Sequence, residues 1–367
     1  MIAFEEEDKM YISILGAGHA GTAVAADLSM RGHEVNLIKT SHAVHDEHFN
    51  ALLENDGSVR MIEKGKSQFA KIKHVTRDLS CLCKSKIIMI FIQSNYHESL
   101  IKRIRPYLRN GQILLLNPGY LSTAYVLKHC FDIDVSIVEA QSSFIDCRIR
   151  EPGTVQVSFR NVRNPLGIYP ASHRKECERK LNQLGFPFVY LPSIVEAALH
   201  NPNLIVHTVG AIMSIPRIEA TKGEYYMYRE VFTPSVWRIL EALDHEKMDV
   251  MEKLGCKRVS YIEACKYRNT LDDTQDAKEV FFGYANMPNP LKGPTVVDSR
   301  FISEDVPQGL VLLETLGLEY EVDTPVCTAL IEIASAALNR DLRLEGRTVE
   351  RLGKDILQQI FQEIEGG

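Results

Sequence analysis

The chain has 367 residues, which at about 100–200 residues per domain predicts two domains. Hydrophobic residues make up 45% and charged residues 25%, a globular composition that excludes a disordered chain. The formal net charge of -6 gives no reason to expect a nucleic-acid partner.

No membrane partner is expected either, because the longest apolar runs, at 87–92 and 113–116, are far shorter than the ~20 residues of a membrane helix. Residues 1–9 are acidic and lack the basic and apolar parts of a signal peptide, which favours the cytoplasm. The 8 cysteines are scattered and form no CxxC pair. We therefore expect free thiols, several of them buried, and no zinc site.

The first predicted elements form a βαβ unit. An apolar run at 11–15 ends at a glycine turn, residues 19–31 have the spacing of a helix, and residues 35–38 alternate as a second strand. The alternation then continues as strand 87–92, helix 97–108, strand 113–116, helix 122–129 and strand 135–138. Continuously apolar strands predict a parallel sheet that is buried on both faces. Shorter, more antiparallel strands are expected over 143–170.

Helical spacing predominates after about residue 190, and no strand is predicted there. The clearest helices cover 234–254, 326–338 and 356–364. The first of them has Thr233 as its expected N-cap, Pro234 at its first position and Gly255 at its end.

The predicted fold class is therefore α/β. A Rossmann-type parallel-sheet domain is expected over 10–190, and a mostly α-helical domain over 191–367.

The strongest functional motif is a glycine-rich turn directly after the first strand. It reads Gly16-Ala17-Gly18-His19-Ala20-Gly21, the GxGxxG pattern. In a βαβ unit the first glycine allows a tight turn, the second lets the backbone approach a pyrophosphate, and the third allows close helix–strand packing. We therefore predict that a dinucleotide binds at Gly16, Gly18, His19, Ala20 and Gly21. A glycine turn without a ligand is the alternative.

The end of the second strand indicates the choice of cofactor. Lys39, Thr40 and Ser41 stand where an acidic residue would bind the ribose 2′-hydroxyl of NAD. A lysine and two hydroxyls suit a 2′-phosphate, which favours NADP over NAD unless Lys39 is an ordinary solvated lysine. Gln93 is also assigned to the cofactor site.

A histidine-rich segment follows this strand. His45 and His48 are three residues apart, so they would share one face of a helix as metal ligands. The segment is polar, which favours the alternative of a solvated helix start beside the adenosine end of the cofactor. We therefore predict no metal site.

Two segments of the second half contain candidates for catalysis. His207 lies in an apolar helical stretch, where it is either a satisfied core histidine or a catalytic acid/base that exchanges a proton near neutral pH. Arg300 and Asp305 are five residues apart. They form either a surface pair or a substrate clamp and a histidine-orienting acid, and the residues alone do not decide between the two.

From Met10 onward the sequence resembles the octopine/nopaline (opine) dehydrogenase family. Besides the glycine-rich turn, the similarity rests on Asn201-Pro202-Asn203 with His207, Tyr228-Arg229-Glu230, Thr233-Pro234-Ser235, Arg300 through Glu304-Asp305-Val306-Pro307, and Gly346-Arg347-Thr348. The Arg…Glu-Asp-Val-Pro segment with the upstream Asn-Pro…His is the most specific part. One position departs from the pattern: the family commonly has proline after the histidine, where this chain has Thr208.

The resemblance implies an enzyme that condenses an amino acid reductively with an α-keto acid, using NAD(P)H. It implies that His207 is the catalytic acid/base, that Asp305 orients it, and that Arg300 binds a substrate carboxylate. Asn203 and Thr233 are assigned to substrate binding. The expected assembly is a homodimer.

Two alternatives stay open. A simple keto-acid reductase would use the same cofactor and the same acid/base pair, and it would turn over without an added amine. An NAD(P)-binding sensor would bind cofactor without any turnover. The sequence does not identify the amino acid or the keto acid.

Overall fold

The structure, a computed structural model, describes residues 9–287 and 292–365. It divides into two compact units. The first comprises the chain up to Ile92 together with Tyr96–Ile194, and the second comprises Gln93–Asn95 and the chain from Val195 onward. The sequence does not predict that Gln93–Asn95 belongs to the second unit. The N-terminal residues 1–8, on which the cytoplasmic prediction partly rests, lie outside the described residues.

The first unit is built on an eight-stranded sheet in the order β12-β11-β8-β7-β6-β1-β2-β5. Its strands are β1 (Tyr11–Leu15), β2 (Glu34–Ile38), β5 (His74–Thr76), β6 (Ile87–Ile90), β7 (Ile113–Leu116), β8 (Ser136–Ala140), β11 (Asn164–Tyr169) and β12 (Phe188–Tyr190). Neighbouring strands run parallel from β5 to β8, and β11 runs antiparallel to β8. The predicted parallel sheet is confirmed, and β6 and β7 are buried at every position.

Helices connect the strands of this sheet. They are α1 (His19–Met30), α2 (Asp46–Glu54), α3 (His97–Ile104), α4 (Thr123–His129) and α5 (Arg174–Asn182). Because β1 lies between β2 and β6, the strand order reverses at β1. Ligands of such sheets bind at the carboxyl ends of the strands beside that reversal.

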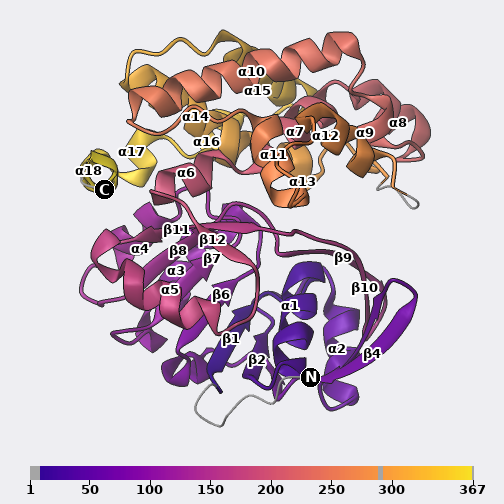
Figure 1. Ribbon diagram of the computed structural model, residues 1–367, viewed down its shortest axis with the longest axis vertical. Coiled ribbons are helices and arrows are strands. Elements are labelled where there is room, and N and C mark those ends of the chain that lie inside the picture. Colours follow the sequence, from indigo (N-terminus) through magenta and orange to yellow (C-terminus); the bar gives the residue numbers. More distant parts are fainter. Residues whose placement is uncertain (1–8, 288–291, 366–367) are drawn as a thin grey trace. The chain divides into compact units, whose positions relative to one another are not determined.

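A second sheet, of four strands, is only partly predicted. Its order is β4-β3-β10-β9, with β3 (Ser58–Glu63), β4 (Lys66–Lys71), β9 (Ile145–Glu151) and β10 (Thr154–Arg160). The pair β9–β10 is antiparallel, as expected for this region, but β10 also pairs in parallel with β3. Figure 1 shows α1 between the main sheet and this second sheet, and every residue of α1 from Gly21 to Leu28 is buried.

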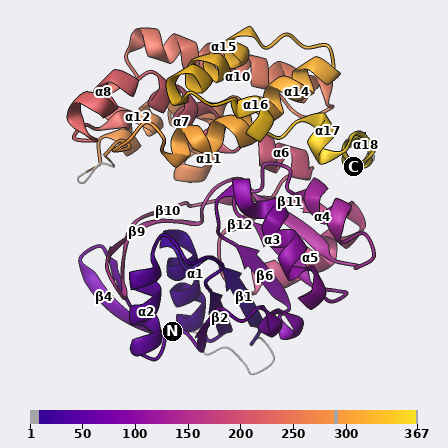
Figure 2. The same cartoon turned by 180° about the vertical axis from the view of Figure 1, so that it is seen from behind.

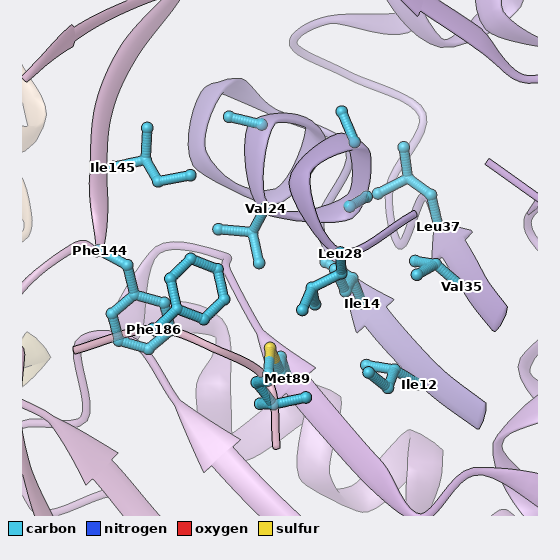
Figure 3. Close-up of a cluster of buried hydrophobic side chains, with 14 of the residues drawn as sticks. Ile12, Ile14, Val24, Leu28, Val35, Leu37, Met89, Phe144, Ile145 and Phe186 are labelled. Carbon is cyan, nitrogen blue, oxygen red and sulfur yellow. The ribbon is translucent and has the colours of Figure 1, made fainter. Parts of the chain in front are cut away.

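The hydrophobic core of the first unit fixes α1 against the sheet. Figure 3 shows Val24 and Leu28 of α1 facing Ile14 of β1, and all three side chains are fully buried. Phe144 and Phe186 extend the same core, with ring centroids 5.4 Å apart. A helix held this firmly gives the glycine-rich turn at its start a rigid support.

The second unit is helical, and no strand follows β12 in the part of the chain that the structure describes. Its helices are α6 (Ile194–Leu199), α7 (Pro202–Ile212), α8 (Ile215–Thr221), α9 (Met227–Glu230), α10 (Pro234–Lys253), α11 (Tyr261–Asn269), α12 (Ala277–Ala285), α13 (Arg300–Ser303), α14 (Val311–Glu319), α15 (Pro325–Leu338), α16 (Leu342–Glu345), α17 (Val349–Leu352) and α18 (Lys354–Glu365). The two longest, α10 and α15, pack side by side (Figure 1, Figure 2).

Helix α10 has the limits that the sequence predicts. Pro234 is its first residue, and Gly255 follows its end with a φ of 83°. Thr233 stands at the N-cap position, as predicted, although its side chain makes no capping hydrogen bond. Thr233 contributes its backbone carbonyl, which accepts the first hydrogen bond of the helix from the Trp237 N–H at 2.8 Å.

The cysteines are all free, as predicted, and six of them are buried: Cys130, Cys147, Cys177, Cys256, Cys265 and Cys327. Among the described residues, no helix is both long enough and apolar enough to cross a bilayer.

Candidate functional site

The glycine-rich turn between β1 and α1 is shaped by close backbone contacts. Gly16 has a φ of 116°, and its N–H donates to the Ile38 carbonyl at 2.8 Å. A Cβ on Gly16 would lie 2.3 Å from the Phe91 carbonyl oxygen, and one on Gly21 would lie 1.9 Å from the Gly16 carbonyl oxygen. Only glycine fits at these two positions, so the tight turn and the close helix–strand contact of the motif are both present.

Gly18 provides space for a ligand. It is the N-cap residue of α1 and its backbone is extended, and no side chain makes a capping hydrogen bond there. A Cβ on Gly18 would meet only the His45 ring, at 3.5 Å. Gly18, His19 and Ala20 are half-exposed at the helix N-terminus, where backbone N–H groups point toward an anion. These residues therefore fit the pyrophosphate of NAD(P).

Lys39 is not an ordinary solvated lysine, since its side chain is only 5% exposed. Its Nζ donates to the Val44 carbonyl at 2.8 Å and to Ser41 Oγ at 3.2 Å. It also forms an ion pair with Asp46, at 3.2 Å. The ammonium group is thus held in a fixed position at the carboxyl end of β2.

Sequence reasoning missed two arginines in this region. Arg77 pairs with Asp46 at 2.9 Å and donates to the Ser41 carbonyl, while Arg103 donates to the Thr40 carbonyl at 3.0 Å. Arg77 directly follows β5, a strand of three residues. A strand this short gives little sequence signal, so the pairing that brings Arg77 beside β2 was not predictable.

The prediction of a solvated helix start is wrong for His48. His48 is 2% exposed; its Nε2 lies 3.2 Å from Thr22 Oγ1, and its Nδ1 accepts from the Gly153 N–H at 3.1 Å. Burial lowers the pKa of His48 to about 4. His45 lies at the N-cap position of α2, with its ring centroid 4.6 Å from that of His19. Among the described residues, no group of three His, Cys, Asp or Glu side chains is placed to hold a metal ion.

His207 and Asp305, 98 positions apart, meet in the helical unit. His207 Nδ1 donates to Asp305 Oδ2 at 2.8 Å. Asp305 is fully buried and His207 is 8% exposed. Phe301 stacks on the imidazole, with 3.8 Å between ring centroids and an interplanar angle of 7°. The ring is therefore fixed in place, and the aspartate selects the tautomer with its proton on Nδ1.

The start of α7 explains how His207 is presented. Asn201 is the N-cap, its Oδ1 accepting from the Asn203 N–H at 3.0 Å, and Pro202 is the first helical residue. Asn203, predicted to bind substrate, is half-buried. Because it is four residues before His207, it lies on the same helix face.

Asp305 directly precedes a short π-helical segment, Val306–Leu310, whose residues are all buried. Such segments are rare and often lie at functional sites. The predicted substrate residue Thr233 lies elsewhere in the sequence of the helical unit, exposed at the N-cap position of α10. The structure thus brings together His207 and Asp305, and the substrate role of Thr233 stays a prediction.

Arg300 lies beside a buried carboxyl group. Its Nε is 3.7 Å from Glu304 Oε2, and its side chain is 49% exposed. Glu304 Oε1 accepts from the Ser94 N–H at 2.8 Å and from Ser94 Oγ at 2.9 Å. Burial raises the pKa of Glu304. The segment that contains Arg300 and Asp305 therefore supplies a half-exposed guanidinium and a buried carboxylate that holds the catalytic candidate His207.

The segment Gln93–Asn95 is built into this unit by long-range hydrogen bonds. Asn95 Nδ2 donates to the Ser303 carbonyl at 2.8 Å, and the fully buried Arg347 donates to the Ser94 carbonyl at 2.9 Å. Gln93, assigned to the cofactor site, is exposed at the start of this segment. Sequence reasoning missed the roles of Glu304 and Arg347, although both lie in segments that carry the family resemblance.

Two family models match the chain. The N-terminus of NAD-dependent glycerol-3-phosphate dehydrogenase matches residues 11–118, and the alpha-helical domain of NAD/NADP octopine/nopaline dehydrogenase matches residues 190–338, which include both His207 and Asp305. An opine dehydrogenase of Arthrobacter sp. (strain 1C) is 27% identical over 358 residues, which cover 95% of this chain and 96% of the relative. The chain is therefore similar to opine dehydrogenases over nearly its whole length, and residues 190–338 match the helical domain of the octopine/nopaline dehydrogenase family.

Opine dehydrogenases share the fold over almost the whole chain. A D-nopaline dehydrogenase of Agrobacterium tumefaciens (strain T37) is 22% identical over 372 residues, which cover 89% of this chain and 85% of the relative. A solved octopine dehydrogenase in complex with NADH and agmatine has a TM-score of 0.74 at 15% identity, covering 96% of this chain and 98% of that one. Yersinopine dehydrogenase with NADP+ bound has a TM-score of 0.70 at 15% identity, covering 98% and 100%. The predicted Rossmann-type and helical domains are confirmed.

Thr208 is the one departure from the opine dehydrogenase pattern singled out in the sequence. Its hydroxyl is buried and donates to the Leu204 carbonyl at 2.6 Å, one turn back along α7. Helix α7 continues past this point to Ile212. Threonine therefore keeps the helix continuous beside His207, where a proline would remove a backbone donor.

Proposed function

We propose that this chain is an opine dehydrogenase that joins an amino acid to an α-keto acid with consumption of NAD(P)H. The observation that supports this best is the buried 2.8 Å hydrogen bond between His207 and Asp305 in the unit that matches the family's helical domain. The glycine-rich turn of the other unit adds a backbone that fits a dinucleotide.

The reaction has two parts. The amine of one substrate adds to the ketone carbon of the other, and loss of water gives an imine. NAD(P)H held at the glycine-rich turn would supply the hydride for reduction of the imine carbon. With one proton the product is a secondary amine that carries both carboxylates. The protein must therefore move protons to and from the reacting oxygen and nitrogen.

His207 performs these proton transfers through Nε2, because its Nδ1–H is directed at Asp305. When the ring takes up a proton, Asp305 stabilises the resulting imidazolium. Both groups are almost completely buried, so their attraction is stronger than it would be in water. The half-exposed Arg300 binds a substrate carboxylate with its planar guanidinium.

The direct test crosses a panel of amino acids with a panel of α-keto acids and follows the loss of NADPH or NADH. Turnover that requires both substrates is the expected result. Turnover with keto acid alone would instead identify a simple keto-acid reductase. Cofactor binding without turnover on any pair would identify a sensor. Either of the last two results would refute the proposal.

The remaining predictions concern domains, location and assembly. We propose that residues 10–190 bind the cofactor and that residues 191–367 provide the acid/base pair. The buried free thiols support a reducing compartment such as the cytoplasm. The predicted homodimer is tested by sedimentation of the full chain, with a single monomeric species as the contrary result.

A further inference from the structure

The carboxyl ends of β2 and β5 are neighbours in the main sheet. The two strands are parallel with Ile38 opposite Thr76, and the Lys39 N–H donates to the Thr76 carbonyl at 3.0 Å. Lys39 and Arg77 are therefore the first residues after two adjacent strands. The glycine-rich turn lies next to these strand ends, because the Gly16 N–H donates to the Ile38 carbonyl at 2.8 Å. Ligands of open parallel sheets bind at these carboxyl ends.

One carboxylate oxygen bridges the two cations there. Asp46 Oδ1 lies 3.2 Å from Lys39 Nζ and 2.9 Å from Arg77 Nη2. Phosphate oxygens prefer the same partners, a lysine ammonium and an arginine guanidinium. The side chains of Arg77 and Asp46 are 28% and 34% exposed, so this point is accessible from solvent.

Both cations are held in position by other contacts. The Lys39 ammonium is buried and donates to the Val44 carbonyl and to Ser41 Oγ. The Arg77 guanidinium lies 4.7 Å from the centroid of the Phe49 ring and donates to the Ser41 carbonyl. Side chains that are already ordered lose little entropy when an anion binds to them.

We propose that Lys39 and Arg77 together bind the adenosine 2′-phosphate of NADPH, and that the Asp46 carboxylate competes with this phosphate for the two cations. The proposal rests on the proposed NAD(P)H-dependent function. An acid that binds the ribose 2′-hydroxyl of NAD normally follows the second strand. Asp46 instead begins α2, and its bridging oxygen contacts two cations. Asp46 therefore lowers the affinity for the 2′-phosphate.

The test measures binding of two probes, adenosine 2′,5′-bisphosphate and adenosine 5′-monophosphate, to the full chain by calorimetry. The wild type is expected to bind the bisphosphate more tightly. Arg77→Ala should weaken bisphosphate binding by about 10- to 100-fold, the effect of losing a charge-assisted hydrogen bond, and leave the monophosphate unchanged. Arg77→Lys should restore part of the loss. Asp46→Asn should tighten bisphosphate binding by about 3- to 10-fold, because the competing charge is removed.

Two exposed positions of the same unit provide matched controls. Arg179→Ala removes a guanidinium that pairs with Glu176, and Asp56→Asn removes a carboxylate that pairs with Lys71. Neither should change the ratio of the two affinities. Equal affinities in the wild type, equal weakening of both probes in Arg77→Ala, or weaker bisphosphate binding in Asp46→Asn would each overturn the proposal. Because binding is measured without turnover, a failure of the proposed enzymatic function is recognised separately.

Discussion

Replacement of His207 by alanine tests the assignment of the acid/base. From the structure we expect this substitution to have two separate effects. Loss of proton transfer is expected to reduce turnover by about 10²–10⁴-fold. The variant is also expected to lower the stability of the helical unit. It loses the buried hydrogen bond to the Asp305 carboxylate, worth about 1.5–3 kcal/mol, and the stacking on Phe301, worth about 0.5–1.5 kcal/mol.

Asp305→Asn separates these effects, because it keeps the shape of the side chain and removes its charge. An amide that presents its NH₂ to the ring favours the tautomer with the proton on Nε2, so turnover should again fall by about 10²–10⁴-fold. Groups that act as one unit lose activity non-additively. The double variant should therefore be little slower than His207→Ala alone.

The assay is steady-state turnover with the best substrate pair, accompanied by cofactor binding and thermal unfolding of each variant. His245→Ala is the control, since this histidine is exposed on α10 of the same unit. Cofactor binding should stay near the wild-type value in all variants. Near-normal turnover of folded His207→Ala would eliminate His207 as the acid/base, and multiplicative losses in the double variant would show that the pair does not act together.

Three further predictions concern other parts of the chain. Gly18→Val should abolish cofactor binding in calorimetry with an unchanged melting temperature. Gly21→Ala should instead lower the melting temperature, because its Cβ would lie 1.9 Å from a carbonyl oxygen. Retained cofactor binding in Gly18→Val would show that the glycine-rich turn does not hold the pyrophosphate. The pKa of His48 in the folded state is about 4, below its unfolded value. Its contribution of roughly 3 kcal/mol to the free energy of unfolding is therefore present above pH ~6.5 and is lost as the pH falls toward 4. Denaturant unfolding of His48→Gln should show a weaker pH dependence of stability in that window, and an unchanged pH dependence would refute this. Arg300→Ala should raise the KM of a carboxylate substrate by about 10-fold or more without a comparable loss of cofactor affinity, and an unchanged KM would exclude the predicted contact.

The parts of the fold that the sequence predicts are encoded locally. The glycine-rich turn needs glycine where a Cβ would collide with carbonyl oxygens, and six consecutive residues are enough to recognise this pattern. The limits of α10 are equally local, since Pro234 fixes its start and Gly255 its end. Strands β6 and β7 are recognisable because burial on both faces makes them continuously apolar.

The second sheet could not be predicted in the same way. Its strands β3 and β10 pair across a long sequence separation, and β4 is exposed at most positions, so its apolar pattern is weak. That sheet accounts for the incorrect prediction at His48, whose Nδ1 is bonded by Gly153 in the turn between β9 and β10. A polar segment appears solvated until the element that covers it is known.

Arg77 and Glu304 were missed for the same physical reason. Arg77 becomes a partner of Lys39 only through the pairing of β2 with β5, and Glu304 is bonded by Ser94, a residue 210 positions away. The spacing of neighbouring residues in the sequence predicts neither of these long-range contacts. Asp305 was found because the family resemblance marks it, and the structure supplies the contact to His207 that the residues alone left open.

The contacts of His207 fit both interpretations that the sequence allowed. The ring is buried, stacked on Phe301 and bonded to a buried carboxylate, as a core histidine would be. The same contacts are what an acid/base requires, because a fixed ring with a chosen tautomer transfers a proton without first being reoriented. A histidine that served only packing would not need a charged partner, since placing a carboxylate in the interior is costly. The buried Asp305 therefore favours the acid/base role over packing alone, and the Asp305→Asn variant tests that choice most directly.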